Sequence, residues 1–176
     1  MMVTVALVGI LAMMAYPSFS SFIQNGQIRA SAESLMSGLQ LARAESIRRN
    51  GAVEFRLLNT LRGQAVTGGT DWSVLASAPE APTVFDQVVQ TRYDDSSGSL
   101  ARAGIATSSG AATAAPGTGL PATIAFTGIG RLSLATSVRQ IDVTGPGQTR
   151  ALHIVLDPPR KGSGRNRSRV RSGRPR

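Results

Sequence analysis

Cationic side chains gather at the end of this chain, at a spacing that suits phosphate binding. Pro158 to Arg176 contains seven arginines and Lys161 but no acid, so this segment supplies +8 of the formal net charge of +9 and leaves +1 for residues 1–157. On an extended backbone, alternating arginines would lie on one side about 6.6 Å apart. The planar guanidinium of arginine is well suited to phosphate oxygens. The candidate binding residues are Arg160, Lys161, Arg165, Arg167, Arg169, Arg171, Arg174 and Arg176.

Several partners fit such a block of charge. Nucleic acid, acidic lipid and an acidic protein face would all attract it. It could also be a solvated charge run or a reading-frame artefact, because the composition changes abruptly after Asp157. No aromatic residue interrupts the segment, so nucleic-acid binding would be tolerant of sequence and sensitive to salt. Val170 is its one apolar side chain other than proline, and we expect residues 158–176 to be disordered in the free protein.

The other residue types offer little for catalysis. The chain has no cysteine, which excludes disulfides and thiolate metal sites, and His153 is its one histidine. There is no serine nucleophile elbow and no carboxylate pair at catalytic spacing. We therefore predict that the protein is not an enzyme, binds no metal and needs no cofactor. His153 should have a structural role, Asp94 and Asp95 should be loop acids, and Gly68-Gly69 should form a turn.

A long helix over residues 1–50 must position whatever follows it. Met1 to Tyr16 is an almost unbroken apolar run, and an amphipathic stretch continues to a stop at Gly51. Pro17 lies between the two and should kink the helix. Such a helix is more than twice as long as the ~30 Å hydrocarbon core of a bilayer, so only its first half is predicted to span a membrane. The apolar run covers only about 24 Å, which suggests that native residues upstream of Met1 are missing.

The second half of the helix shows one apolar face. Its apolar residues recur at spacings of three and four, which is typical of a helix packed on a sheet. This stripe consists of Ile28, Ala32, Leu35, Leu39 and Ala42, and Met36 and Ile47 are predicted to widen it.

Residues 51–157 change to short β-rich runs and form the predicted globular head. A helix followed by strands, with no crossover helices, favours an α+β fold with antiparallel pairing. The Ser/Gly/Ala-rich stretch from Asp94 to Pro121 is predicted to be a long surface loop, and Trp72 an anchor in the core or on the sheet face. The predicted strands are 52–58, 72–76, 83–89, 122–126, 131–135, 138–143 and 149–156.

Two stretches of the helix resemble the type IV pilin-like proteins, specifically the FimT/GspH group of minor pilins and pseudopilins. They are the run Met2-Val-Thr-Val-Ala-Leu-Val-Gly-Ile-Leu-Ala with Pro17-Ser-Phe, and Leu39-Gln-Leu-Ala-Arg-Ala-Glu-Ser-Ile-Arg-Arg-Asn50. Trp72 and Gly130-Arg131 extend the likeness more weakly. The resemblance implies a helix anchored in the bacterial inner membrane before assembly and packed in a filament core afterwards, with the head in the periplasm. Its partners would be other pilins or pseudopilins.

This sequence departs from that group in two ways. Members carry a leader that ends in Gly, is cleaved before a Phe, and is followed by a Glu near the mature start, and none of these is visible here. Many relatives also have a cysteine pair, which this chain lacks.

The basic segment narrows the expected role. It resembles the C-terminal region of DNA-binding FimT-type minor pilins of natural transformation, which carry a Gly-Arg-x-Arg motif. Gly164-Arg165-Asn166-Arg167 matches that motif and Gly173-Arg174-Pro175-Arg176 repeats it. The resemblance implies a minor pilin that binds the DNA backbone during uptake. The alternative is a pseudopilin of type II secretion acting in protein export.

Overall fold

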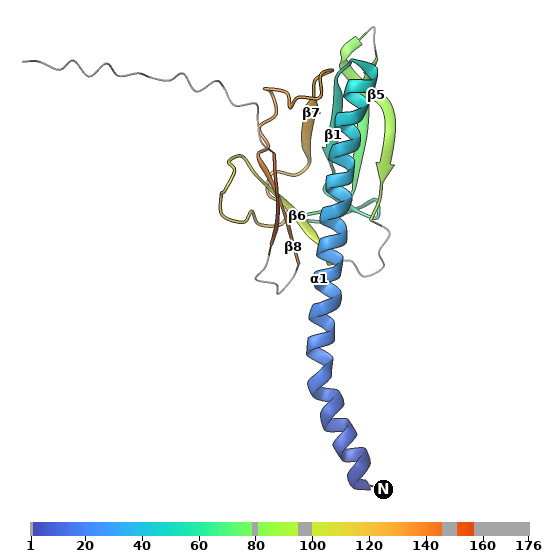
Figure 1. Ribbon diagram of the computed structural model, residues 1–176, viewed down its shortest axis with the longest axis vertical. Coiled ribbons are helices and arrows are strands. Elements are labelled where there is room, and N and C mark those ends of the chain that lie inside the picture. The colour runs from blue at the N-terminus through green and yellow to red at the C-terminus, as the bar shows by residue number, and fades with distance from the viewer. Residues whose placement is uncertain (1, 79–80, 95–99, 146–150, 157–176) are drawn as a thin grey trace, which may run out of the picture.

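The computed structural model describes residues 2–78, 81–94, 100–145 and 151–156. The basic segment and its predicted disorder lie outside these residues. The chain forms one long helix, α1 (Met2–Arg49), and a head of β-strands. At a rise of 1.5 Å per residue, α1 is about 72 Å long. Figure 1 shows the head packed along the C-terminal half of α1, with the N-terminal half extending beyond it.

Helical residues continue through Pro17 without a break. A proline removes one backbone hydrogen-bond donor and crowds the preceding turn of a helix. A helix can bend at such a residue without ending there. The axis of α1 changes direction within its N-terminal half (Figure 1). The kink at Pro17 itself stays a prediction.

The apolar stripe of α1 is the helix side of the core. All five residues of the stripe, Ile28, Ala32, Leu35, Leu39 and Ala42, are buried. The prediction that Met36 and Ile47 widen the buried stripe was wrong, because Met36 is 47% exposed and Ile47 is 54% exposed. Both lie about 80–100° around the helix from the middle of the stripe, and the head covers a narrower face that includes Ser46.

The helix ends where it was predicted to end. Asn50 has a left-handed backbone (φ 47°), and its N–H donates to the carbonyl of Ile47 at 3.1 Å. The N–H of Gly51 donates to the carbonyl of Ser46 at 3.2 Å. This pair of bonds is the Schellman motif, and it directs the chain back along the helix into the first strand.

The head contains two larger antiparallel sheets and a small hairpin. One sheet has the order β5-β4-β1-β7, the other has the order β6-β8-β9, and β2 pairs with β3. Every strand pair in the described chain is antiparallel, as predicted. The strands are β1 (Val53–Leu57), β2 (Thr60–Leu61), β3 (Gln64–Ala65), β4 (Trp72–Ala78), β5 (Ala81–Arg92), β6 (Arg102–Ala106), β7 (Ala122–Phe126), β8 (Gln140–Thr144) and β9 (Leu152–Val155).

Trp72 anchors the sheet to α1, as predicted. Its ring lies 5.7 Å from the ring of Phe55, centre to centre, and its Nε1–H donates to Ser34 Oγ at 3.0 Å. Gly38 faces both rings, and a Cβ there would lie 2.7 Å from the Phe55 ring. The absence of a side chain at Gly38 therefore lets α1 approach the sheet closely.

The prediction of an uninterrupted loop from Asp94 to Pro121 was wrong. The stretch from Asp94 to Pro121 contains β6, which pairs with β8 and buries Ala103 and Ile105 in the core. Its small residues are a packing requirement, because a Cβ on Gly104 would lie 2.4 Å from the carbonyl oxygen of Ala115. The stretch that follows β6 folds back over it, and the N–H of Ile105 donates to the carbonyl of Thr118 at 2.9 Å.

The predicted strand 131–135 was also wrong. It contains a single bridge between Leu132 and Phe126, followed by turn residues. The N–H of Thr136 donates to the carbonyl of Ser133 at 3.1 Å, and this turn ends the run after Ser133, which leaves too little length for a strand. The predicted strand 122–126 has the same bounds as β7, and the other predicted strands are present with one or both ends shifted.

Candidate functional site

The N-terminal half of α1 presents apolar side chains that nothing in the described head covers. Among its described residues, Val3 is 76% exposed, Val5 73% and Phe22 75%. The sequence has no charged residue before Arg29. A large exposed apolar surface of this kind marks a contact with another protein or with lipid. Within the described part of the chain, no helical stretch combines the length and the apolar character needed to cross a bilayer.

A carboxylate fixes the helix to the head near the point where α1 leaves it. Ser31 on α1 and Thr70 each donate a hydroxyl hydrogen bond to Asp94 Oδ2 at 3.2 Å. The Asp94 N–H in turn donates to Asp71 Oδ1 at 2.8 Å. Asp94 follows β5 as a loop acid, as predicted, and it also connects two parts of the fold. Asp95 lies outside the described residues.

Asp71 is fully buried and organises the hairpin β2–β3. It accepts hydrogen bonds from Thr60 Oγ1 at 2.9 Å and from the backbone N–H of Gly63 at 2.8 Å. A buried carboxylate is tolerated when several donors surround it. These donors belong to the fold, so Asp71 has a structural role.

An ion cluster stabilises the other end of the helix. Glu45 is bound by Arg48 at 2.6 Å and by Arg49 at 2.7 Å, and Arg49 also donates to Gln87 on β5 at 2.8 Å. Hydrogen bonds from Arg48 and then Arg49 lower the pKa of the Glu45 carboxyl from 4.5 to about 2. This cluster orients the last turn of α1 against the sheet.

His153 lies in a polar network between two strands. Its Nδ1 is 2.6 Å from Oδ1 of the fully buried Asp142, which makes Nδ1–H the donor. Oδ2 of Asp142 accepts the backbone N–H of Ala114 at 2.6 Å, and Gln140 Oε1 accepts that of Gly110 at 3.0 Å. The network holds the stretch after β6 on the β8–β9 hairpin, which agrees with the structural role predicted for His153.

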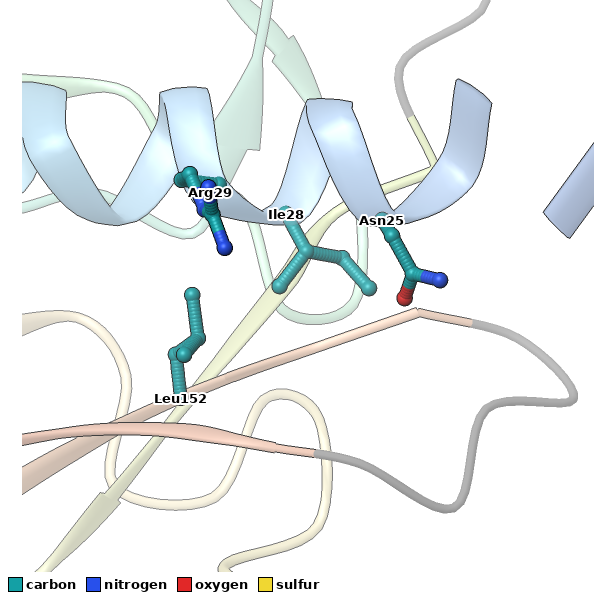
Figure 2. A pocket seen from close by; sticks show the side chains of 4 residues that line it. All are labelled: Asn25, Ile28, Arg29 and Leu152. Carbon is teal, nitrogen blue, oxygen red and sulfur yellow. The ribbon is translucent and has the colours of Figure 1, made fainter. Parts of the chain in front are cut away.

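Clefts on the described surface include three of about 300 to 500 Å³. One, of about 300 Å³, separates α1 from the start of β9; Figure 2 shows Asn25, Ile28 and Arg29 on the helix side of this cleft and Leu152 on the strand side. A second, of about 500 Å³, lies around the helix end and β4. The third, of about 410 Å³, is lined by Arg43, Phe126, Gly130, Arg131, Leu132, Val155 and Leu156. Among the described residues, no three of His, Cys, Asp and Glu form a group that could hold a metal ion.

The sequence-predicted binding residues lie elsewhere. Gly164 and the eight cations of the basic segment are outside the described residues, so their arrangement stays a prediction. The sequence placed Arg43 in a family-like stretch of the helix and Arg131 at the start of a predicted strand, and did not bring them together beside one cleft. Gly130 is the residue that could have indicated the cleft, because the turn there brings Arg131 close to α1.

Comparison with known families gives one match. The family described as type II transport protein GspH matches residues 31–159, which is well over half of the chain. The matched region starts within the buried stripe of α1 and includes every described strand of the head. No curated protein and no solved structure matches the chain.

Proposed function

This chain belongs to the GspH family and is therefore a pilin-like subunit, a pseudopilin or minor pilin; from this premise we propose that it enters a filament through the exposed half of α1. The observation that carries the proposal is the apolar surface that includes Val3, Val5 and Phe22, which a single copy leaves exposed to solvent. Packing against the helices of neighbouring subunits would bury it. Before assembly, we propose, the same half of α1 holds the protein in the inner membrane with the head in the periplasm.

Replacing apolar side chains of this surface tests the assembly role. Val3→Asn with Val5→Asn should reduce the amount of protein recovered in sheared or purified filaments by at least about tenfold, because polar amides would have to be desolvated in the helix bundle. Val84→Asn with Val88→Asn is the matched control, since these valines are also exposed but lie on β5 of the head. Equal recovery of both variants would contradict the proposal.

A second proposed function is non-specific DNA binding by the basic segment, which would contribute to DNA uptake. It is supported by the sequence of residues 158–176, where eight cations occur without an acid. Phosphate contacts from Arg165 and Arg167 would be the core of the site, with support from Arg160, Lys161, Arg169, Arg171, Arg174 and Arg176. Gly164 would allow the backbone to approach the DNA closely.

Salt-dependent binding tests the DNA proposal. Arg165→Ala with Arg167→Ala should weaken binding to all duplex sequences alike, and each lost phosphate contact should reduce the slope of log K against log salt by about 0.9. Arg62→Ala with Arg92→Ala is the control, because it removes the same charge from exposed positions of the head. Unchanged binding in the first double variant would contradict DNA capture. Stronger binding to anionic vesicles than to duplex at equal salt would favour acidic lipid.

The family name favours the alternative role in protein export. In that case the filament would belong to a type II secretion system and DNA uptake would be unaffected. Deleting the gene distinguishes the roles: loss of protein export with normal transformation favours secretion, and the reverse favours a type IV pilus.

A further inference from the structure

The cleft at the upper end of α1 joins three parts of the fold. Arg43 comes from the helix, Arg131 from the turn after β7, and Val155 from β9. Its volume of about 410 Å³ is large enough for a few side chains. We call it the Arg43–Arg131 cleft.

Neither arginine of the cleft has a described partner. The acid nearest to Arg43 in the sequence is Glu45, and it is engaged by Arg48 and Arg49 instead. Arg43 and Arg131 are both exposed, and within the described residues no ion pair or hydrogen bond involves either side chain. The cleft therefore presents two positive charges that an incoming anion could meet without breaking an existing bond.

The surroundings of the two arginines are apolar. Phe126 and Leu132 are buried in the floor of the cleft, and Val155 at its edge is 54% exposed. Ile47 lies one helical turn from Arg43 and is 54% exposed, and Ile129, next to the lining residue Gly130, is 68% exposed. Exposed aliphatic side chains around arginines are typical of protein interfaces.

The turn that carries Arg131 is seated firmly on the helix. Gly130 has φ +71°, and a Cβ there would lie 2.6 Å from Ile47 Cδ1 and 3.4 Å from Arg43 Cγ. Its N–H is bonded to Thr127, and the Thr127 N–H donates to the carbonyl of Arg131 at 2.8 Å. A fixed backbone loses little entropy on binding, so ordering of the turn adds little to the cost of binding a ligand there.

We propose that the Arg43–Arg131 cleft docks an acidic and apolar segment of another protein subunit. Carboxylates of that segment pair with Arg43 and Arg131, and an aliphatic side chain between them covers Val155 and the floor. Nucleic acid would satisfy the arginines but not the aliphatic edge, and the described cleft offers no exposed aromatic ring for base stacking. The proposal rests on the subunit role proposed above and adds a contact on the head to that of the helix.

Labelled peptides test this docking surface. The full chain in detergent is titrated into a labelled short peptide that alternates Glu and Leu, and binding is followed by fluorescence anisotropy. The same titration is made with a peptide in which Gln replaces Glu, with one in which Ser replaces Leu, and with labelled duplex DNA. The Glu/Leu peptide should bind best, and Arg43→Ala with Arg131→Ala should weaken it about tenfold or more, as expected for loss of charge-assisted hydrogen bonds. Arg62→Ala with Arg92→Ala is the control for net charge and should bind like the wild type.

Three outcomes would overturn the proposal. Equal binding of the Glu/Leu and Glu/Ser peptides would show that the aliphatic edge contributes nothing. Loss of duplex binding to the same extent in the cleft variant would identify a nucleic-acid surface. Peptide binding that appears only with Asp157→Asn would show that the chain's own carboxylate occupies the cleft. Because the assay uses unassembled protein, it can fail while the helix variants still abolish filament entry, and the two proposals are thereby separated.

Discussion

Glu45 illustrates at the residue scale how the helix end is held. Its side chain is 11% exposed and receives guanidinium hydrogen bonds from two successive arginines, Arg48 and Arg49. Both arginines also complement the negative end of the helix dipole. The cluster thus adds charge pairing to the backbone bonds of the Schellman motif at Asn50 and Gly51.

The lowered pKa of Glu45 predicts acid sensitivity. Because the folded-state pKa of about 2 lies below the ordinary 4.5, the ion cluster contributes its full stability above pH 4.5 and loses it as the pH falls toward 2. The side chain of Arg48 is 67% exposed, so solvent screening should limit the contribution to about 1 kcal/mol. Urea unfolding of Glu45→Gln should show a smaller loss of stability than the wild type between pH 5 and pH 3.

Glu33→Gln provides the control for this titration. Glu33 is an exposed glutamate on the same helix, and the described residues give it no ion pair. Its removal should leave the pH dependence of the wild type unchanged. If Glu45→Gln and Glu33→Gln have the same acid profile, the cluster does not contribute to stability.

At the element scale, the contact between α1 and the sheet depends on the small residue at Gly38. Gly38→Ala should destabilise the head by about 1–3 kcal/mol because the new methyl group overlaps the rings of Phe55 and Trp72. Gly26→Ala is the matched substitution in the same helix, where nothing lies within 4 Å of the new Cβ. Helix propensity alone would make both changes favourable by up to about 1 kcal/mol. The thermal unfolding midpoint should therefore fall for Gly38→Ala and rise or stay unchanged for Gly26→Ala. Equal shifts of the two midpoints would contradict tight packing at Gly38.

The same contact shows what the sequence could predict about the elements. The spacing of Ile28, Leu35 and Ala42 was sufficient to identify the buried face of α1, because burial of a helix follows its period. Met36 and Ile47 were assigned to that face incorrectly, since the width of the covered strip depends on how the sheet sits. That position is set by long-range contacts such as the one at Gly38, which a local pattern does not reveal.

Strand β6 was missed for a related reason. Ile105 is the one large apolar residue of β6, and the small size of Ala103 and Gly104 is explained only by the chain that crosses them after residue 106. The candidate surfaces differ in the same way. The apolar half of α1 was predicted from its uncharged sequence, but the placement of Arg43 and Arg131 beside one cleft depends on the turn at Gly130. Residues that belong to one helix are predictable from spacing, whereas those that converge from three elements are not.

At the scale of the whole molecule, the core that the structure describes lies within residues 28–156. The buried core extends from Ile28 to Val143, with Ile154 and Leu156 packed against it. The family match likewise ends at residue 159, before Arg165 and Arg167. We therefore expect the head and helix to fold without residues 158–176, so that binding of a polyanion would be an added property of the end of the chain.

The expected independence of the fold from residues 158–176 can be tested with a chain that ends at Asp157. Its thermal unfolding midpoint and its recovery in filaments should match those of the full chain, because the core and the exposed half of α1 are retained. Its affinity for duplex DNA should fall to the level of the head alone, since the head and helix carry a net charge of only +1 and release few counterions. Binding isotherms over a range of salt concentrations, with unfolding monitored on the same preparations, would measure both properties. A lower midpoint would place residues 158–176 in the fold, and unchanged DNA affinity would move the polyanion site onto the head.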